Sequence, residues 1–195
     1  MSAPFHKFGI AEEVPHRIYH RAEGDRDWEA FDIDGPHPLA AVFPLLTIEC
    51  HRKQQMADLF KSGSKAIVSE RFRRACEPFR VTAEFLPIKV IVPSGEPANG
   101  GPYWFVHLLE RIDCIDYNAS VFEAWSERAD SELRRISKLV FREDAIGERA
   151  LFKPKRYSQL FASQQLHDSL LKAGCLVSFT PTDKVTLGGL RERIG

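Results

Sequence analysis

Residues 160–181, LFASQQLHDSLLKAGCLVSFTP, and residues 66–87, AIVSERFRRACEPFRVTAEFLP, share one order of patterns. In each, a short apolar run reaches a Ser, a stretch with helical spacing follows, and an alternating apolar run closes on Pro. Each stretch therefore predicts a strand–helix–strand unit. Gene duplication and convergence on a common supersecondary unit both account for the likeness, and the small number of identical positions favours convergence.

The ends of the two helices are marked by residues with known capping chemistry. Ser69 and Ser163 each precede a helical stretch, where a Ser hydroxyl can accept a hydrogen bond from a free N–H group of the first turn. Gly174 follows the second helix and suits a left-handed C-cap. Pro78 makes the end of the first helix less definite, because proline disrupts a helix interior.

The rest of the chain alternates between strand-like and helix-like patterns. The strand-like runs at residues 81–92 and 102–109 flank a loop rich in Gly and Pro and predict an antiparallel hairpin. Helical patterns occupy residues 52–61 and 120–129, and residues 136–141 read as a strand. Residues 1–38 are polar and broken by Pro and Gly, which predicts irregular structure with one short strand near residues 28–33.

This mixture predicts an α+β fold with a mixed, mainly antiparallel sheet on which helices pack. The 195 residues, of which 44% are hydrophobic, can bury a substantial core. We expect one domain over residues 1–195, in which residues 1–50 form a subregion packed on a core of residues 51–183.

Cysteine usage and the absence of targeting patterns indicate a cytoplasmic protein. The four cysteines are widely spaced, each in or beside an apolar run, which predicts reduced, buried thiols; they are Cys50, Cys76, Cys114 and Cys175. The N-terminus lacks the basic and apolar regions of a secretory signal, and no apolar run approaches the ~20 residues that span a bilayer. We therefore expect no membrane association.

The charges balance to zero, with 27 basic and 27 acidic residues, but they are distributed in blocks. Residues 1–50 and 81–130 are acidic, whereas residues 51–80 and 131–195 are basic. The blocks either pair with one another across the fold or form a surface that steers a partner of opposite charge. A nucleic acid partner is not favoured, because a pI near 7 lacks the expected excess of Lys and Arg.

Motifs for phosphate, dinucleotide or zinc-hydrolase chemistry are absent from the sequence. His16 and His20 have a spacing that can hold zinc on a helix face, but no third ligand follows at an obvious spacing. Cys50 and His51 are adjacent, and adjacent side chains usually point apart, so they do not by themselves form a dyad; a thiolate–imidazole pair with a distant His stays open. The sequence predicts neither a metal nor a cofactor.

Asp113 and Asp116 have a spacing that could place two carboxylates on one helical turn, where they could share a proton or bind a cation. The alternative interpretation is structural. In it, Asp116 or Asn118 caps a turn before Ser120, and Asp113 is solvated.

Three segments, read in order, resemble a family of bacterial polymorphic-toxin immunity proteins, the type known as immunity protein eleven. They are the Ser69 unit, the run YWFVHLLERIDCIDYNAS at residues 103–120, and the Ser163 unit. The resemblance covers roughly residues 60–182. The family pattern ends with a second Gly before the Phe, whereas this chain has Val177 and Ser178 in the run between Gly174 and Phe179.

The resemblance implies a non-catalytic binding protein that neutralises a cognate toxin encoded nearby. From their chemistry alone, we expect acidic and aromatic side chains as candidate contacts: Tyr103, Trp104, Asp113, Asp116, Tyr117 and Trp125. Two other hypotheses stay open: a structural module that forms a homodimer, and an enzyme that uses Asp113 and Asp116.

Overall fold

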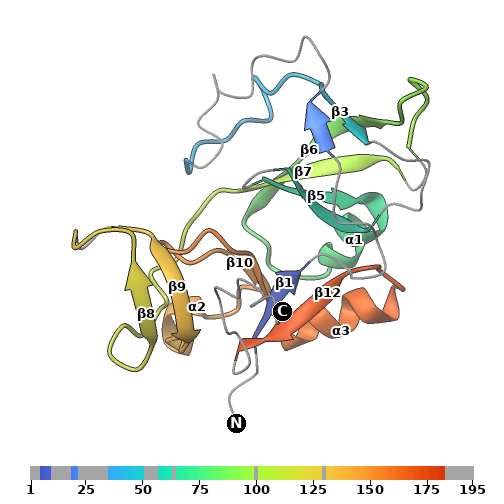
Figure 1. Ribbon diagram of the computed structural model, residues 1–195. Coiled ribbons are helices and arrows are strands. Elements are labelled where there is room, and N and C mark those ends of the chain that lie inside the picture. Colours follow the sequence, from blue (N-terminus) through green and yellow to red (C-terminus); the bar gives the residue numbers. More distant parts are fainter. Residues whose placement is uncertain are drawn as a thin grey trace, which may run out of the picture.

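The computed structural model describes residues 5–9, 19–21, 35–50, 57–62, 65–98, 101–128 and 131–182 (Figure 1). They form three β-sheets and three helices, α1 (Glu70–Cys76), α2 (Glu143–Ile146) and α3 (Gln164–Lys172). The sheets are mixed and mainly antiparallel, which confirms the predicted α+β class.

The larger sheet has six strands. In spatial order they are β2 (Tyr19–Arg21), β3 (Leu46–Cys50), β6 (Ala83–Ile91), β7 (Tyr103–Leu108), β5 (Lys65–Ser69) and β4 (Leu59–Ser62). Only the pair β3 and β6 is parallel; the other neighbours are antiparallel. The pairing of β6 with β7 confirms the hairpin predicted from the sequence.

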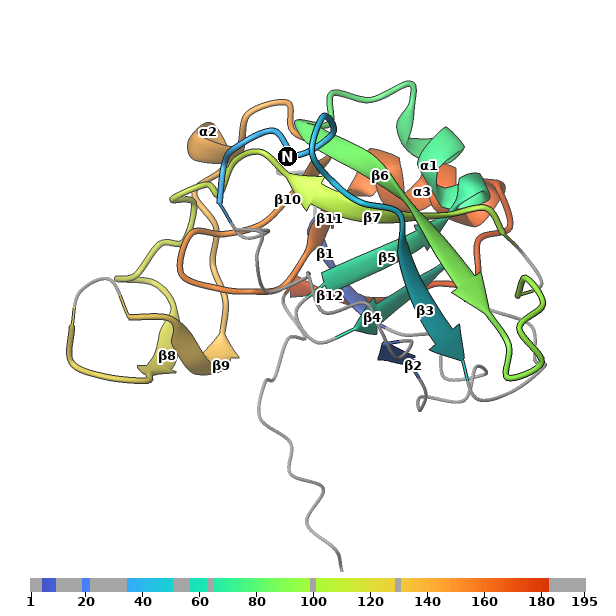
Figure 2. The same cartoon turned by 90° about the horizontal axis from the view of Figure 1, so that it is seen from above.

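The second sheet has four strands and the third has two. The four are, in spatial order, β10 (Leu151–Phe152), β11 (Phe161–Ser163), β1 (Phe5–Gly9) and β12 (Ser178–Pro181). The third sheet is the antiparallel pair β8 (Val121–Ala124) and β9 (Leu133–Lys138), which projects from one side of the molecule in Figures 1 and 2.

Both strand–helix–strand units have the same topology, in which a strand from outside the unit lies between the two strands of the unit. In the first unit, β5 leads into α1 and then β6, and β7 lies antiparallel between β5 and β6. In the second, β11 leads into α3 and then β12, and β1 lies antiparallel between them. The common pattern in the sequence thus corresponds to a common split unit, although each inserted strand comes from outside it.

The predicted caps are present in both helices. The Ser69 hydroxyl accepts a hydrogen bond from the Phe72 N–H (3.2 Å), and the Ser163 hydroxyl accepts one from the Leu166 N–H (3.3 Å). Gly174 has a φ of +67°, and its N–H and that of the next residue bond to carbonyls of the last helical turn. These two hydrogen bonds form the Schellman motif, which a glycine in the left-handed conformation permits.

The two units share one hydrophobic core, because α1 and α3 lie side by side (Figure 2). Phe72 and Leu166, which align in the two sequence stretches, are both fully buried in this core. Phe85 and Phe179, which also align, pack against it. A second apolar cluster lies on the six-stranded sheet around Phe60 and a third lies beneath β8 and β9.

Asp58 joins the two units through its carboxylate, which is 6% exposed. One oxygen accepts a hydrogen bond from the Ser69 hydroxyl, and the other accepts one from the Leu176 N–H (2.7 Å). The backbone of Asp58 also bonds to the same two residues (3.0 and 3.1 Å). The guanidinium of Arg71 lies 3.9 Å from the carboxylate and donates to the Gly174 carbonyl.

Two of the predicted helices are wrong where the structure describes them. Within residues 120–129, residues 121–124 form β8, because pairing with β9 and the bonds of the Ser120 hydroxyl to Val140 hold this segment extended. Within residues 52–61, Leu59 and Phe60 begin β4, which pairs with β5 and buries both side chains. Strand β9 begins before the predicted residues 136–141, and Phe141 makes only an isolated bridge with Ile115.

The prediction of irregular structure over residues 1–38 is wrong for β1 and β2. Strand β1 lies inside the four-stranded sheet, where Phe8 is buried against Phe72. The expected strand at residues 28–33 and the helical residues 52–56 lie outside the described residues. Cys76, Cys114 and Cys175 are free and buried, which confirms the expectation for these three.

We expect Asp58→Ala to lower the free energy of unfolding by about 3 kcal/mol, because the buried Ser69 hydroxyl and the part-buried Leu176 N–H lose a charged acceptor. Urea unfolding followed by circular dichroism measures this change. The matched control is Glu148→Ala, whose side chain is 87% exposed and which should change the free energy by less than about 0.5 kcal/mol. A loss below about 1 kcal/mol for Asp58→Ala would show that the carboxylate does not hold the units together.

Candidate partner-binding surface

The aromatic residues predicted on β7 lie on opposite faces of the sheet. Tyr103 is 3% exposed and packs edge-on against Phe60, with ring centroids 5.6 Å apart, so it belongs to the core. Trp104 is half-buried, with the Arg73 guanidinium 5.2 Å from its ring centroid. Neither residue lies on the projecting hairpin.

Asp113 and Asp116 have separate roles, because the segment that carries them is not helical. Asp116 accepts hydrogen bonds from the N–H groups of Asn118 and Ala119 (3.0 Å each) and so caps a turn. The Asp113 side chain is 58% exposed, lies 3.9 Å from Arg142 and accepts a bond from the Tyr117 hydroxyl (3.3 Å). This confirms the structural interpretation of the two carboxylates.

Tyr117 leads into the projecting hairpin, which we call the hairpin arm (residues 117–128 and 131–138). Its ring packs edge-on against Phe122, with centroids 5.8 Å apart, and the Arg156 guanidinium lies 5.0 Å from the Tyr117 centroid. Leu133 and Ile136 bury the arm's inner face in the third apolar cluster. The base of the arm is therefore fixed by packing.

Trp125 lies farther along the arm and is 67% exposed. The Arg134 guanidinium lies 5.0 Å from the centroid of the Trp125 ring. The backbone N–H of Trp125 donates to the Glu132 carbonyl (3.1 Å). Such a cation–π pair orders the ring without covering it. The arm therefore presents an aromatic–arginine pair of the kind that often anchors protein interfaces.

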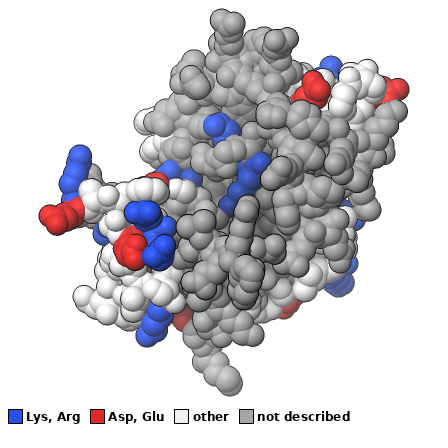
Figure 3. All heavy atoms as spheres, in the orientation of Figure 1, with Lys and Arg blue, Asp and Glu red and all other residues white. Residues whose placement is uncertain are grey.

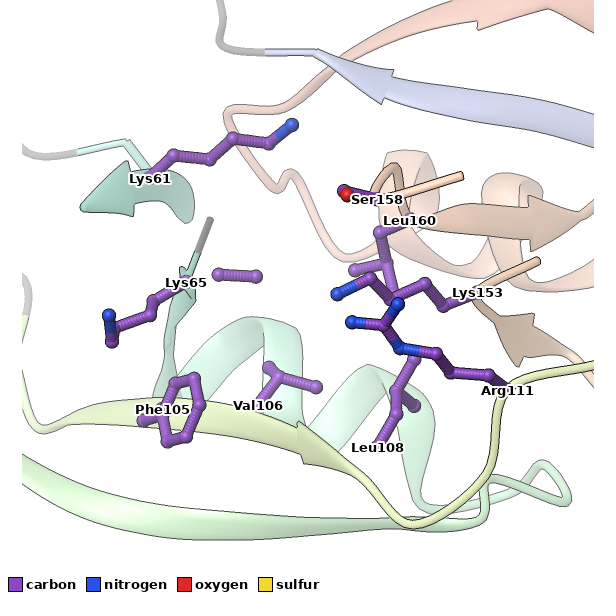
Figure 4. Close-up of a pocket in the computed structure, with 10 residues that line it drawn as sticks. Lys61, Lys65, Phe105, Val106, Leu108, Arg111, Lys153, Ser158 and Leu160 are labelled. Atoms are coloured by element: carbon purple, nitrogen blue, oxygen red, sulfur yellow. The ribbon is translucent and has the colours of Figure 1, made fainter. Parts of the chain in front are cut away.

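A basic cleft lies next to the arm, and the sequence did not single out its residues. Figure 4 shows Lys61 and Lys65 on the side of β4 and β5, with Arg111 and Lys153 on the opposite side. Its apolar lining comes mainly from Phe105, Val106, Leu108 and Leu160. The cleft volume of about 40 Å³ holds a few waters or one small polar group. The one signal in the sequence that agrees with a basic cleft is the excess of Lys and Arg in residues 51–80 and 131–195.

Burial and neighbouring cations disfavour the charged form of Lys61. Burial, and after it the positive charges of Lys7 and Lys153, lowers the pKa of Lys61 to about 8. Burial also lowers the pKa of Lys7. The Lys61 amine donates a hydrogen bond to Gln159 Oε1 (2.5 Å), a neutral acceptor that does not balance its charge. A negative group placed here would relieve this repulsion.

Hydrogen bonds connect the basic cleft to the hairpin arm. Glu132 of the arm accepts bonds from Arg111 (3.4 Å) and from the Ser158 hydroxyl (3.0 Å), and both donors line the cleft. Arg156 donates to the Ser131 carbonyl at the arm (2.7 Å). In Figure 3, Lys and Arg side chains are visible in the middle of the face shown, and nearer its rim side chains of both charges occur.

Among the residues that the structure describes, no three His, Cys, Asp or Glu side chains gather in the arrangement of a metal site. The side chains of His16, His20, Cys50 and His51 lie outside that description. None of the helices within the described ranges has the length and apolar character needed to cross a bilayer.

Comparison with known protein families assigns the chain to one of them. The model of the immunity protein family (Imm11) matches residues 12–182, so the chain belongs to this family. The match confirms the resemblance seen in the sequence and begins earlier in the chain. A search of curated proteins gave no match.

We expect Lys61→Met to raise the free energy of unfolding at pH 7 by about 1 kcal/mol, because it removes a cation that the fold disfavours. The unfolded chain keeps its Lys61 proton up to a pH near 10.5, whereas the folded chain releases it near pH 8. The unaltered protein therefore gains stability relative to the variant as the pH rises through this window.

Urea titrations at pH 7 and pH 10 measure this difference. The exposed Lys155→Met is the matched control, and we expect no change in its urea midpoint at either pH. A lower midpoint for Lys61→Met at pH 7 would show that the lysine stabilises the fold and that the cleft is not electrostatically strained.

Proposed function

We propose that this chain is an immunity protein that neutralises a cognate bacterial toxin by direct, non-catalytic binding. The observation that carries the proposal is the family match over residues 12–182. The toxin is encoded nearby, and the pair forms in the cytoplasm. The metal and cofactor chemistry of an enzyme has no part in this function.

The hairpin arm supports binding through a protein interface. Trp125 is large, exposed and oriented by Arg134, so its rotamer freedom is already reduced before a partner arrives. Ordering a side chain in advance lowers the entropic cost of association. The aromatic pair Tyr117 and Phe122, with Arg156 above it, supports the arm from the side of the core.

The dimensions of the basic cleft favour a side chain of a partner over a free substrate. Sites for small molecules have volumes of about 300–1,000 Å³, and this cleft has about 40 Å³. Asp116 is committed to capping its turn, so it does not form a free carboxylate pair with Asp113. These features support an interaction surface at the arm and the cleft.

We expect Trp125→Ala to weaken binding of the toxin domain encoded by the neighbouring gene at least about tenfold, because aromatic anchors contribute disproportionately to affinity. Calorimetric titration of the purified pair and rescue of growth on co-expression measure the effect. The fold should be unaffected, since the indole is exposed.

The matched control is Leu171→Ala, an exposed apolar side chain on α3 that should leave affinity unchanged. If the unaltered chain neither binds the toxin domain nor restores growth, the immunity function is refuted. A homodimer that dissociates on Trp125→Ala, detected by light scattering, would instead support the self-association hypothesis.

A further inference from the structure

The basic cleft brings together positive charge that arises from four separate segments of the chain. Lys61 and Lys65 come from β4 and β5, Arg111 follows β7, and Lys153 follows β10. Lys7 on β1 acts on Lys61 through its charge. Lys7 and Lys153 repel the charge on Lys61, so the fold holds Lys61 here at a cost in stability. Arg111, in contrast, is paired with Glu132 at 3.4 Å.

The lining of the cleft determines which anion fits. Leu160, Val106 and Leu108 provide apolar surface beside the cationic groups. A carboxylate on a short aliphatic stem matches this combination, because its methylene groups contact the apolar lining while its oxygens reach the cations. Low-dielectric walls also strengthen the attraction of cations for a carboxylate.

The volume and the overall charge argue against a nucleic acid at this site. A cleft of about 40 Å³ admits one carboxylate but no base or sugar. The net charge of the chain is zero, which gives little general attraction for a polyanion. The acidic side chain of a protein is therefore the occupant that the cleft fits.

We infer that the basic cleft receives a glutamate or aspartate side chain from an acidic segment of the toxin, an inference that rests on the proposed function. The arm and the cleft then bind one partner together, with Trp125 as the apolar anchor and the cleft as the charged one. Glu132 connects them, because it bonds to Arg111 and Ser158 of the cleft wall.

The first test uses a fluorescent, capped tetraglutamate peptide as the probe and measures its anisotropy with increasing protein at about 10 mM ionic strength, where the Debye length is about 30 Å. We expect saturable binding that Lys61→Met weakens at least tenfold. The Lys61→Arg variant keeps the charge and should restore most of the binding. The exposed Lys172→Met, on α3 and away from the cleft and the arm, is the matched control and should bind as the unaltered chain does.

Two results would overturn the inference. One is equal binding of the peptide by Lys61→Met and by the unaltered chain, or no binding by either. The other is tighter binding of a single-stranded oligothymidylate of the same charge, which would assign the cleft to nucleic acid. Circular dichroism and urea midpoints establish that each variant is folded before its binding is compared.

The second test uses the toxin domain and separates this inference from the proposed function. If the toxin domain binds the unaltered chain, we expect Lys61→Met to slow association and reduce affinity at least tenfold, with a weaker dependence on salt. Toxin binding that is unchanged in Lys61→Met overturns the cleft's role and leaves the immunity function intact. Failure of the unaltered chain to bind the toxin refutes the immunity function, and the peptide titration then decides whether the cleft recognises carboxylates.

Discussion

The buried carboxylate of Asp58 is the constraint on which the arrangement of the two units depends. It accepts hydrogen bonds from the Ser69 hydroxyl at the start of α1 and from the Leu176 N–H after α3. These bonds fix the beginning of one helix relative to the end of the other. The Ser69 hydroxyl also caps α1. A buried charge is tolerated only when its hydrogen-bonding capacity is filled, and these bonds fill most of it. The shared core between α1 and α3 follows from this placement.

The same arrangement brings the strands of both sheets to the basic cleft. Strands β4 and β5 of the larger sheet and the segment after β10 of the smaller one meet there, and residues 153–160 continue to the base of the hairpin arm. The fold therefore places the disfavoured Lys61 cation near an arm that carries the exposed Trp125. We propose that both features serve binding.

The local structure could be predicted from the sequence, but its long-range pairing could not. Ser69, Ser163 and Gly174 mark their helix ends by chemistry that acts within a few residues, so both capped units were foreseen. The insertion of β1 between β11 and β12 depends on contacts across the whole chain, and the five residues FHKFG carry no signal of which strands they pair with. The segment at β8 has helical composition, and its pairing with β9 overrides that preference. Trp125 was singled out by its chemistry, and its role as a contact stays a prediction, whereas Lys61 and Arg111 line one cleft only in the folded protein.

Amide hydrogen exchange of the chain, alone and saturated with the toxin domain of the neighbouring gene, tests the central claim most directly. If the toxin binds at the arm and the cleft together, amides in residues 117–135 and 153–160 should exchange more slowly in the complex, while those of α3 should be unchanged. Slower exchange confined to the surface of α1 and α3, with none at the arm or the cleft, would contradict the account.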